Sequence, residues 1–200
     1  MMHSLKILGA AAGATVLFAT ASVAGTPVVV LTPAFTEKTS DVLVPAAKDP
    51  SACTVTVAAL SDERRDPKTV GIVVDRAVQS PDDTQAWMRA IVGGLAARGV
   101  TPQFDTPAQP AGSAAPVARF GLKTVWLTPV NTDFSSDVIM SVDATAPDGR
   151  VLKKTYRGQV TVLNWNSGVS EMQTAITRAF SDALNKMAPD LKAICQKPSM

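Results

Sequence analysis

The sequence predicts an α+β fold, a two-layer sandwich in which two helices pack on one face of a mainly antiparallel sheet. Strand-like segments with alternating apolar residues lie between residues 53 and 75 and between residues 120 and 163. Each group is followed by an amphipathic helix pattern, around residues 80–98 and 169–189. Strand hairpins mixed with two such helices favour a two-layer arrangement.

The first 24 residues are typical of a secretory signal. A short basic segment ending at Lys6 precedes an unbroken apolar run from Ile7 to Phe18. Small residues up to Ala24 then suit a signal peptidase, which predicts cleavage after Ala24 and export to the periplasm. The alternative is a membrane anchor, but this run is shorter than the roughly 20 apolar residues that a spanning helix needs. No later segment is long and apolar enough to span a membrane.

Beyond the signal, the chain divides into three predicted parts. Residues 25–51 form a Pro-rich extended N-terminal arm that could hold one edge strand, residues 52–195 form a single α+β domain, and residues 196–200 form a disordered tail. Four prolines break the arm: Pro27, Pro33, Pro45 and Pro50. The domain opens with the strand "CTVTVAAL" from Cys53, and a second short strand follows in "TVGIVVD".

The first helix is expected to begin at Ser80 and to run for about 16 residues. Ser80 can cap it, and a proline at position 81 suits the first helical position. Trp87, Ile91 and Leu95 recur every four residues and form a core-facing stripe. Gly99 suits the left-handed residue after the helix. A Pro-rich surface loop follows over residues 102–119.

Three strands and a second helix complete the predicted domain. The strands cover residues 120–130, 135–146 and 151–163, and Asp148-Gly149 predicts a tight type I′ turn between the last two. Pro189 is expected to end the last helix. The apolar stripe of that helix comprises Met172, Ile176, Phe180, Ala183, Leu184 and Met187.

Charge and composition exclude several function classes. The chain has 19 Lys and Arg residues and 17 Asp and Glu residues. Removal of the leader takes away Lys6 and no acid, which leaves 18 basic and 17 acidic residues. That balance argues against a nucleic-acid partner. The leader also contains His3, the only histidine, so the exported chain cannot use a catalytic histidine or a His-containing metal site. We expect neither a metal nor a cofactor.

The two cysteines are expected to pair. Cys53 precedes the first strand and Cys195 follows the last helix pattern. In an exported chain two cysteines usually form a disulfide, and the alternative is a pair of free thiols.

Candidate site residues gather in the stretch "SDERRDPK". Asp62, Glu63 or Asp66 could act as a general acid or base, and Arg64 or Arg65 could bind an anion. The alternatives are a contact surface for a partner and, more simply, a self-compensating solvated turn. The pattern indicates no catalytic residue, so Asp62, Arg64, Arg65 and Asp66 are binding candidates.

A further binding candidate is Trp165. It lies in "LNWNSG", where a turn would expose it as an anchor for a partner. Trp126, Phe134 and Tyr156 could join it in a sugar-stacking face, although aromatic residues on strands more often belong to the core.

The order of elements and several short words resemble the YajG-type lipoproteins of Gram-negative bacteria. The words are "SDERRDPKTVGI", "LAARGV", "SDVIMSVDATAPDGRVLKKTYRGQVTV" and "AITRAFSDALNKM", within residues 53–190. The resemblance implies an envelope protein that faces the periplasm and has no enzymatic role to transfer. The chain departs from that family because no lipid-accepting cysteine stands at the signal cleavage site, which favours a soluble periplasmic protein.

Together these observations predict a non-enzymatic binding or accessory protein of the bacterial envelope. Its partner would be an envelope protein or a small ligand. The alternatives are a carboxylate-dependent hydrolase of envelope polymers and a small-ligand carrier with a pocket between helices and sheet.

Overall fold

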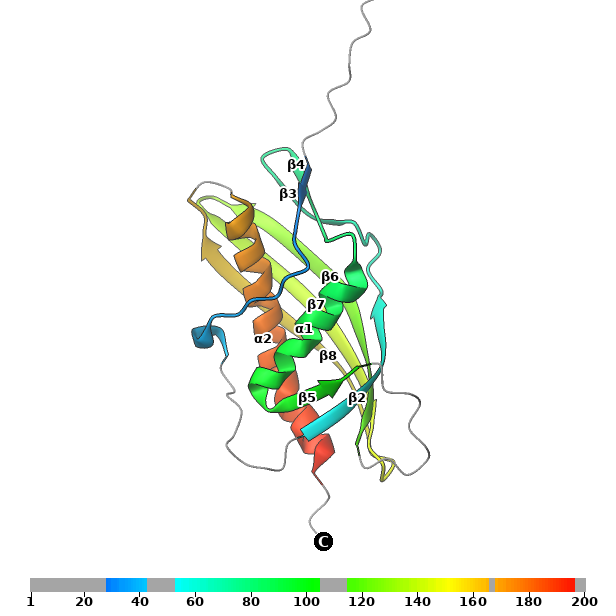
Figure 1. The fold of residues 1–200 in the computed structure, drawn as a ribbon. Coiled ribbons are helices and arrows are strands. Elements are labelled where there is room, and N and C mark those ends of the chain that lie inside the picture. Colours follow the sequence, from blue (N-terminus) through cyan, green and yellow to red (C-terminus); the bar gives the residue numbers. More distant parts are fainter. Residues whose placement is uncertain (1–27, 43–52, 105–114, 166–167, 197–200) are drawn as a thin grey trace, which may run out of the picture.

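The structure, a computed structural model, describes residues 28–42, 53–104, 115–165 and 168–196. The predicted leader and residues 197–200 of the predicted tail lie outside these ranges. The described chain forms the predicted α+β sandwich, with helices α1 and α2 on one face of an eight-stranded sheet (Figure 1). The strands are β1 (Val28–Val30), β2 (Cys53–Asp62), β3 (Thr69–Val73), β4 (Arg76–Gln79), β5 (Val100–Gln103), β6 (Val117–Val130), β7 (Asp133–Thr145) and β8 (Val151–Leu163). The helices are α1 (Thr84–Gly93) and α2 (Val169–Cys195), with 3-10 turns η1 (Thr39–Asp41) and η2 (Gly94–Arg98).

Strand β6 organises the sheet. It pairs with β7 in antiparallel register along its whole length, and β7 pairs with β8 in the same way. On its other side β6 pairs in parallel with β2 and then, at Gly71 and Leu127, with β3. A Cβ on Gly71 would lie only 2.5 Å from the Leu127 carbonyl oxygen, so this close approach requires glycine. Strands β1 and β5 add parallel pairs to β4 and β2.

Two of the tight turns between strands differ from what the sequence predicts. Pro147 has no N–H to close a two-residue loop around Asp148-Gly149. The loop is therefore longer: the Ala146 N–H donates to the Arg150 carbonyl at 2.9 Å, and only Gly149 of the turn has a positive φ, 87°. The hairpin between β3 and β4, which the sequence did not predict, turns at Val74 and Asp75, both with positive φ.

Both helices have different ends from those expected. Helix α1 begins at Thr84, because the Asp83 carboxylate accepts the Ala86 N–H at 2.8 Å. The predicted cap, Ser80, instead donates its hydroxyl to the Pro67 carbonyl at 2.5 Å.

Helix α2 continues past Pro189 to Cys195, so the predicted end is wrong. A proline inside a helix costs about 3 kcal/mol, and contacts beyond it offset this cost. The Asp190 carboxylate accepts hydrogen bonds from Tyr156 and Lys154 of β8, each at 2.6 Å. These bonds lower the pKa of Asp190. Buried apolar side chains and the disulfide also hold this last stretch of the helix.

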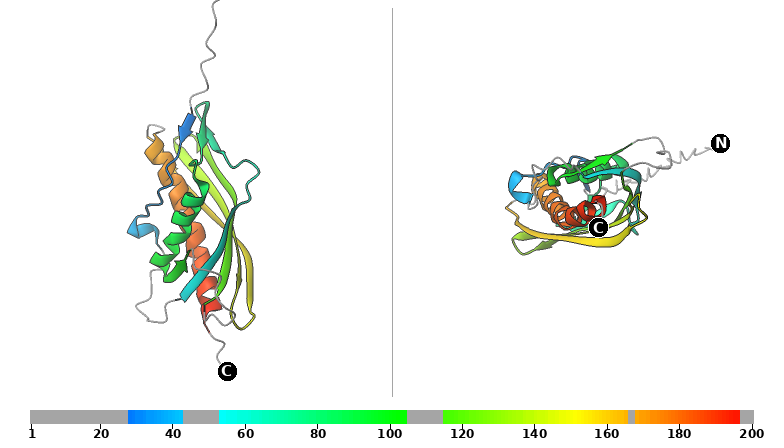
Figure 2. Two further views of the ribbon diagram at one scale, coloured as in Figure 1. Left: turned by 45° about the vertical axis from the view of Figure 1, so that its right-hand side comes forward. Right: turned by 90° about the horizontal axis from the view of Figure 1, so that it is seen from below.

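The core lies between the sheet and α2, which packs directly on the sheet. Figure 2 shows the sheet curved around the helices. At Gly158 of β8 the backbones of strand and helix meet: a Cβ there would lie 2.7 Å from the Ala183 nitrogen. The predicted disulfide joins Cys53 to Cys195, 142 positions apart, and ties the start of β2 to the end of α2.

Candidate functional site

The predicted charged stretch contains one internal ion pair, between Asp62 and Arg64. Arg64 is buried, donates to both Asp62 carboxylate oxygens at 2.8 and 2.6 Å, and donates to the Pro67 carbonyl at 2.6 Å. Its guanidinium also lies over the Trp87 ring, 5.8 Å from the centroid. Arg64 therefore joins this loop to the core, whereas Arg65 is exposed.

The two other carboxylates of this loop have partners of their own. Glu63 pairs with Lys123 at 3.1 Å and accepts the Ser61 hydroxyl, which together lower its pKa. Asp66 accepts the backbone N–H groups of Thr69 and Lys68, with the same effect on its pKa. Each acid faces a different partner, and none of them lines the groove described below.

Trp165 lies in the turn between β8 and α2, and 83% of its surface is exposed, as predicted for a turn position. Its backbone N–H donates to Glu171, whose carboxylate also caps the start of α2. Of the other aromatic candidates, Phe134 and Tyr156 are buried, and Trp126 on β6 is exposed.

The most prominent arrangement involves a segment that sequence analysis placed only in the arm. Residues 31–42, hereafter the strap, leave β1 and cross the face of α2 that is turned away from the sheet (Figure 1). Gln173 of α2 holds the start of the strap: its side chain accepts the Thr32 N–H at 3.1 Å and donates to the Ala34 carbonyl at 3.2 Å. Phe35 then packs edge-on against Phe180 of α2, with ring centroids 6.4 Å apart.

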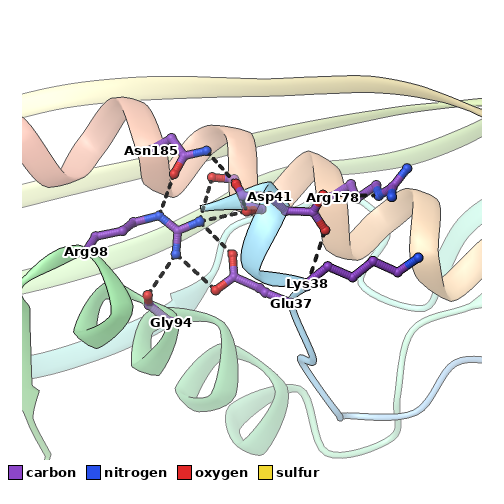
Figure 3. Close-up of polar contacts among 8 residues, drawn as sticks. Glu37, Lys38, Asp41, Gly94, Arg98, Arg178 and Asn185 are labelled. Carbon is purple, nitrogen blue, oxygen red and sulfur yellow. Dashed lines mark hydrogen bonds and ion pairs between the residues drawn. The ribbon is translucent and has the colours of Figure 1, made fainter. Parts of the chain in front are cut away.

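A buried arginine anchors the far end of the strap (Figure 3). Arg98 is fully buried, and its two terminal nitrogens donate to the two Glu37 carboxylate oxygens at 3.0 and 2.6 Å. The remaining donors reach Asn185 at 2.8 Å, the Gly94 carbonyl at 2.8 Å and the Ser181 hydroxyl at 2.7 Å. All five N–H groups of the guanidinium are thus occupied.

Two further contacts complete the anchor. The Ser181 hydroxyl and the Asn185 amide both donate to the Asp41 backbone carbonyl at 2.9 Å. Gly94 lets the strap come close, because a Cβ there would lie 3.1 Å from the Glu37 carboxylate and closer still to Phe35. A bidentate arginine–carboxylate pair with these neighbours fixes the strap in one position.

Strap and α2 enclose a groove of about 300 Å³, hereafter the strap groove. The strap contributes Thr32, Ala34, Thr36, Lys38 and Asp41 to its walls. Helix α2 contributes Ser170, Gln173, Thr174, Thr177 and Arg178. Hydroxyl-bearing residues and three charged residues thus occur in the lining, although carbon atoms provide most of its exposed surface.

The charged side chains of the groove are only loosely paired. The Arg178 Nε lies 3.4 Å from an Asp41 carboxylate oxygen, and this buried nitrogen has no hydrogen-bond partner in the described chain. The other Asp41 oxygen accepts the Lys38 backbone N–H at 3.4 Å. Figure 3 shows the Lys38 and Arg178 side chains extending to the same side of Asp41.

The described residues contain no cluster of three or more His, Cys, Asp or Glu side chains that could bind a metal. Neither α1 nor α2 combines the length and the apolar character needed to cross a lipid bilayer.

Sequence analysis missed the strap groove because its parts are far apart in the chain. One signal could have shown that Arg98 is buried. It follows Trp87, Ile91 and Leu95 on the same helical face, since Leu95 and Arg98 are three positions apart. An arginine at the end of a core-facing stripe requires an acidic partner. The N-terminal arm, which precedes the domain in the sequence, contains acids that could serve as this partner.

No family model matches the chain, and no curated protein matches it, so the predicted resemblance to YajG-type lipoproteins stays a prediction. Solved structures with loosely similar folds include a protein of the family DUF330 from Xanthomonas campestris, with 11% identity and a TM-score of 0.40 over 82% of this chain and 92% of that chain. A hypothetical protein from Chlamydia trachomatis has 9% identity and a TM-score of 0.45, and the match covers 70% of this chain and 98% of that chain. A lipoprotein from Neisseria meningitidis has 13% identity and a TM-score of 0.35 over 68% and 99%. At this level of similarity no function is transferred.

Proposed function

We propose that the protein is an exported, non-enzymatic binding protein of the bacterial envelope, and that it binds a small polar ligand in the strap groove. Two observations support export. The first 24 residues have the pattern of a cleaved signal, and the Cys53–Cys195 disulfide fits an oxidising compartment such as the periplasm. Intact mass of the protein isolated from the periplasm tests this: a chain that begins at Gly25 is expected, and a chain retained in the cytoplasm with its leader would contradict it.

The groove itself is the observation that supports binding. Its volume of about 300 Å³ lies at the lower end of the range for small-molecule sites. Its outer wall, the strap, is held by the buried Arg98–Glu37 pair rather than by groove residues alone. A wall fixed by contacts outside the groove is already in place before a ligand arrives, which reduces the free energy spent on ordering it.

The hydrolase alternative has less support. A general acid needs a raised pKa near the working pH. The contacts of Glu63 and Asp66 lower the pKa of both groups, and Asp62 is bound to Arg64. Replacement of Asp62, Glu63 or Asp66, one at a time, by the corresponding amide is expected to leave ligand binding unchanged. Loss of an envelope-polymer hydrolysis activity in one of these variants would favour the enzyme.

Ligand-observed NMR on the chain from residue 25 tests the binding function. The probes are glucose, N-acetylglucosamine, glycerol, glucuronate and glucose 6-phosphate. Thr174→Trp places a bulky ring in the groove from a partly exposed position on α2, and Thr161→Trp places the same ring at an exposed position on β8, away from the groove. Binding of at least one probe that Thr174→Trp abolishes and Thr161→Trp preserves is expected. Equal binding to both variants, or none to the wild type, would contradict the proposal.

A second candidate function, contact with an envelope protein, is favoured by the exposure of Trp165. In-cell crosslinking followed by pull-down from the envelope fraction tests it with Trp165→Ala as the control. One dominant partner that is lost in the control is expected. The same proteins recovered with both chains would refute a role for this surface.

A further inference from the structure

We propose that the strap groove selects a small, hydroxyl-bearing molecule that carries a carboxylate or phosphate group, and that Arg178 and Lys38 bind this group from opposite walls. The inference rests on the proposed binding function of the groove and names the chemical class of its ligand. Sugar acids and sugar phosphates share this chemistry.

Arg178 has donors to offer a ligand. Its side chain is about two-thirds buried, with 32% exposed, and within the described part of the chain its Nε has the Asp41 carboxylate at 3.4 Å but no hydrogen-bond partner. Arg98, on the other side of the strap, uses all five of its donors. A partly buried guanidinium with free donors is well suited to a planar or tetrahedral oxyanion, which it can bind through two parallel hydrogen bonds.

Asp41 does not neutralise the groove. Its contact with the Arg178 Nε is 3.4 Å long, and its other oxygen faces the Lys38 backbone at a similar distance. Lys38 is exposed and its ammonium has no ion-pair partner among the described residues. Glu37, the other nearby acid, is committed to Arg98. Two cations and one carboxylate leave one net positive charge, which favours an anionic ligand.

The remaining walls favour hydroxyl groups. Thr32, Thr36, Ser170 and Thr177 line the groove, and the hydroxyl of each can donate and accept a hydrogen bond. A volume of about 300 Å³ corresponds to about ten water-sized groups at roughly 30 Å³ each. That size fits one monosaccharide.

Isothermal titration calorimetry with four probes tests the proposal: glucuronate, glucose 6-phosphate, inorganic phosphate and glucose. Arg178→Gln and Lys38→Gln remove one charge each. The control is Arg157→Gln on β8, which removes the same charge from an exposed arginine paired with Asp137 on the sheet. Circular dichroism and thermal unfolding check that each variant folds.

Glucuronate or glucose 6-phosphate is expected to bind at least about 10-fold more tightly than glucose, because charge-assisted hydrogen bonds contribute more than neutral ones. Arg178→Gln is expected to weaken that binding by about 10- to 100-fold, and Arg157→Gln to leave it unchanged. Preference for glucuronate identifies a carboxylate ligand, and preference for glucose 6-phosphate a phosphate ligand.

Three results would overturn the inference. If glucose binds as tightly as the charged sugars and Arg178→Gln has no effect, the groove binds a ligand but does not select an anion. If inorganic phosphate binds as tightly as glucose 6-phosphate, the hydroxyl groups are not recognised. If no probe binds, this inference and the proposed binding function both fail.

Discussion

Replacement of Glu37 by glutamine tests whether the buried guanidinium of Arg98 holds the strap on the helices. The substitution keeps the size of the side chain but removes its charge. It also places an amide NH₂ group where one carboxylate oxygen now accepts a hydrogen bond from Arg98 at 2.6 or 3.0 Å. The guanidinium would then be buried without its acid.

The expected effect follows from the burial of the pair. Arg98 is fully buried and only 10% of the Glu37 side chain is exposed, so solvent screens the pair weakly. Removal of one partner from a buried ion pair typically costs about 3–5 kcal/mol. Among the other apolar side chains of the strap, Leu31 is buried and Phe35 is partly buried, so the strap is expected to detach while the domain stays folded.

Hydrogen exchange measured by mass spectrometry reports this local opening. Loss of about 3 kcal/mol should speed exchange of the strap amides beside the anchor, such as those of Lys38 and Asp41, by about 100-fold or more where local opening limits exchange. The sheet strands β6, β7 and β8 should exchange at nearly their original rates. The control is Glu63→Gln, which breaks an ion pair with Lys123 whose acid is 43% exposed and should cost less than about 1 kcal/mol.

Equal strap exchange in Glu37→Gln, Glu63→Gln and the wild type would refute the reasoning. It would mean that Arg98 keeps the strap in place through Asn185, Ser181 and Gly94 alone, or that the strap opens independently of this anchor.

Three other predictions concern stability. Gly158→Ala places a Cβ 2.7 Å from the Ala183 nitrogen. This substitution should lower the free energy of unfolding, measured by urea titration, by about 1–3 kcal/mol or more. An unchanged urea midpoint would contradict the direct contact of α2 with β8. Replacement of Cys53 and Cys195 by serine opens the 142-residue loop that the disulfide closes, and loss of this cross-link should cost about 5 kcal/mol. The Tm measured by calorimetry should therefore fall by about 10–20 °C. A fall of less than about 2 °C would contradict this prediction. The pKa of Asp190 is lower in the folded than in the unfolded state. Its contribution to the free energy of unfolding is therefore fully present above the unfolded pKa of about 3.9. This contribution is lost as the pH falls through that value and then through the folded pKa. Urea midpoints should therefore fall below about pH 4, less steeply in Asp190→Asn; identical pH profiles would contradict this assignment.

Local patterns in the sequence predicted most of the fold. The alternation in β6, β7 and β8 and the stripes of α1 and α2 depend on which face of one element is buried, and that is readable from residue spacing. The failures occurred where distant contacts override local preference. Helix α2 passes Pro189 because Asp190 bonds to β8, and Ser80 bonds to Pro67 instead of capping α1.

The candidate site was less predictable than the fold. The charged stretch around Asp62 stood out because its residues are neighbours in sequence, but neighbours with opposite charges pair with each other. The strap groove joins residues 32–41 to residues 170–178, and Arg98 anchors it from a third segment. No single window of sequence contains enough of that arrangement to indicate a site.

Mapping of a ligand on the protein by NMR tests the central claim most directly. Glucuronate would be titrated into the ¹⁵N-labelled chain from residue 25, and the shifts of backbone amides and arginine Nε–H groups would be followed. The account predicts that perturbations gather in residues 32–41 and 170–178, with the Arg178 Nε–H signal among them. Perturbations centred on Trp165 or on residues 62–68, with the strap unaffected, would contradict it.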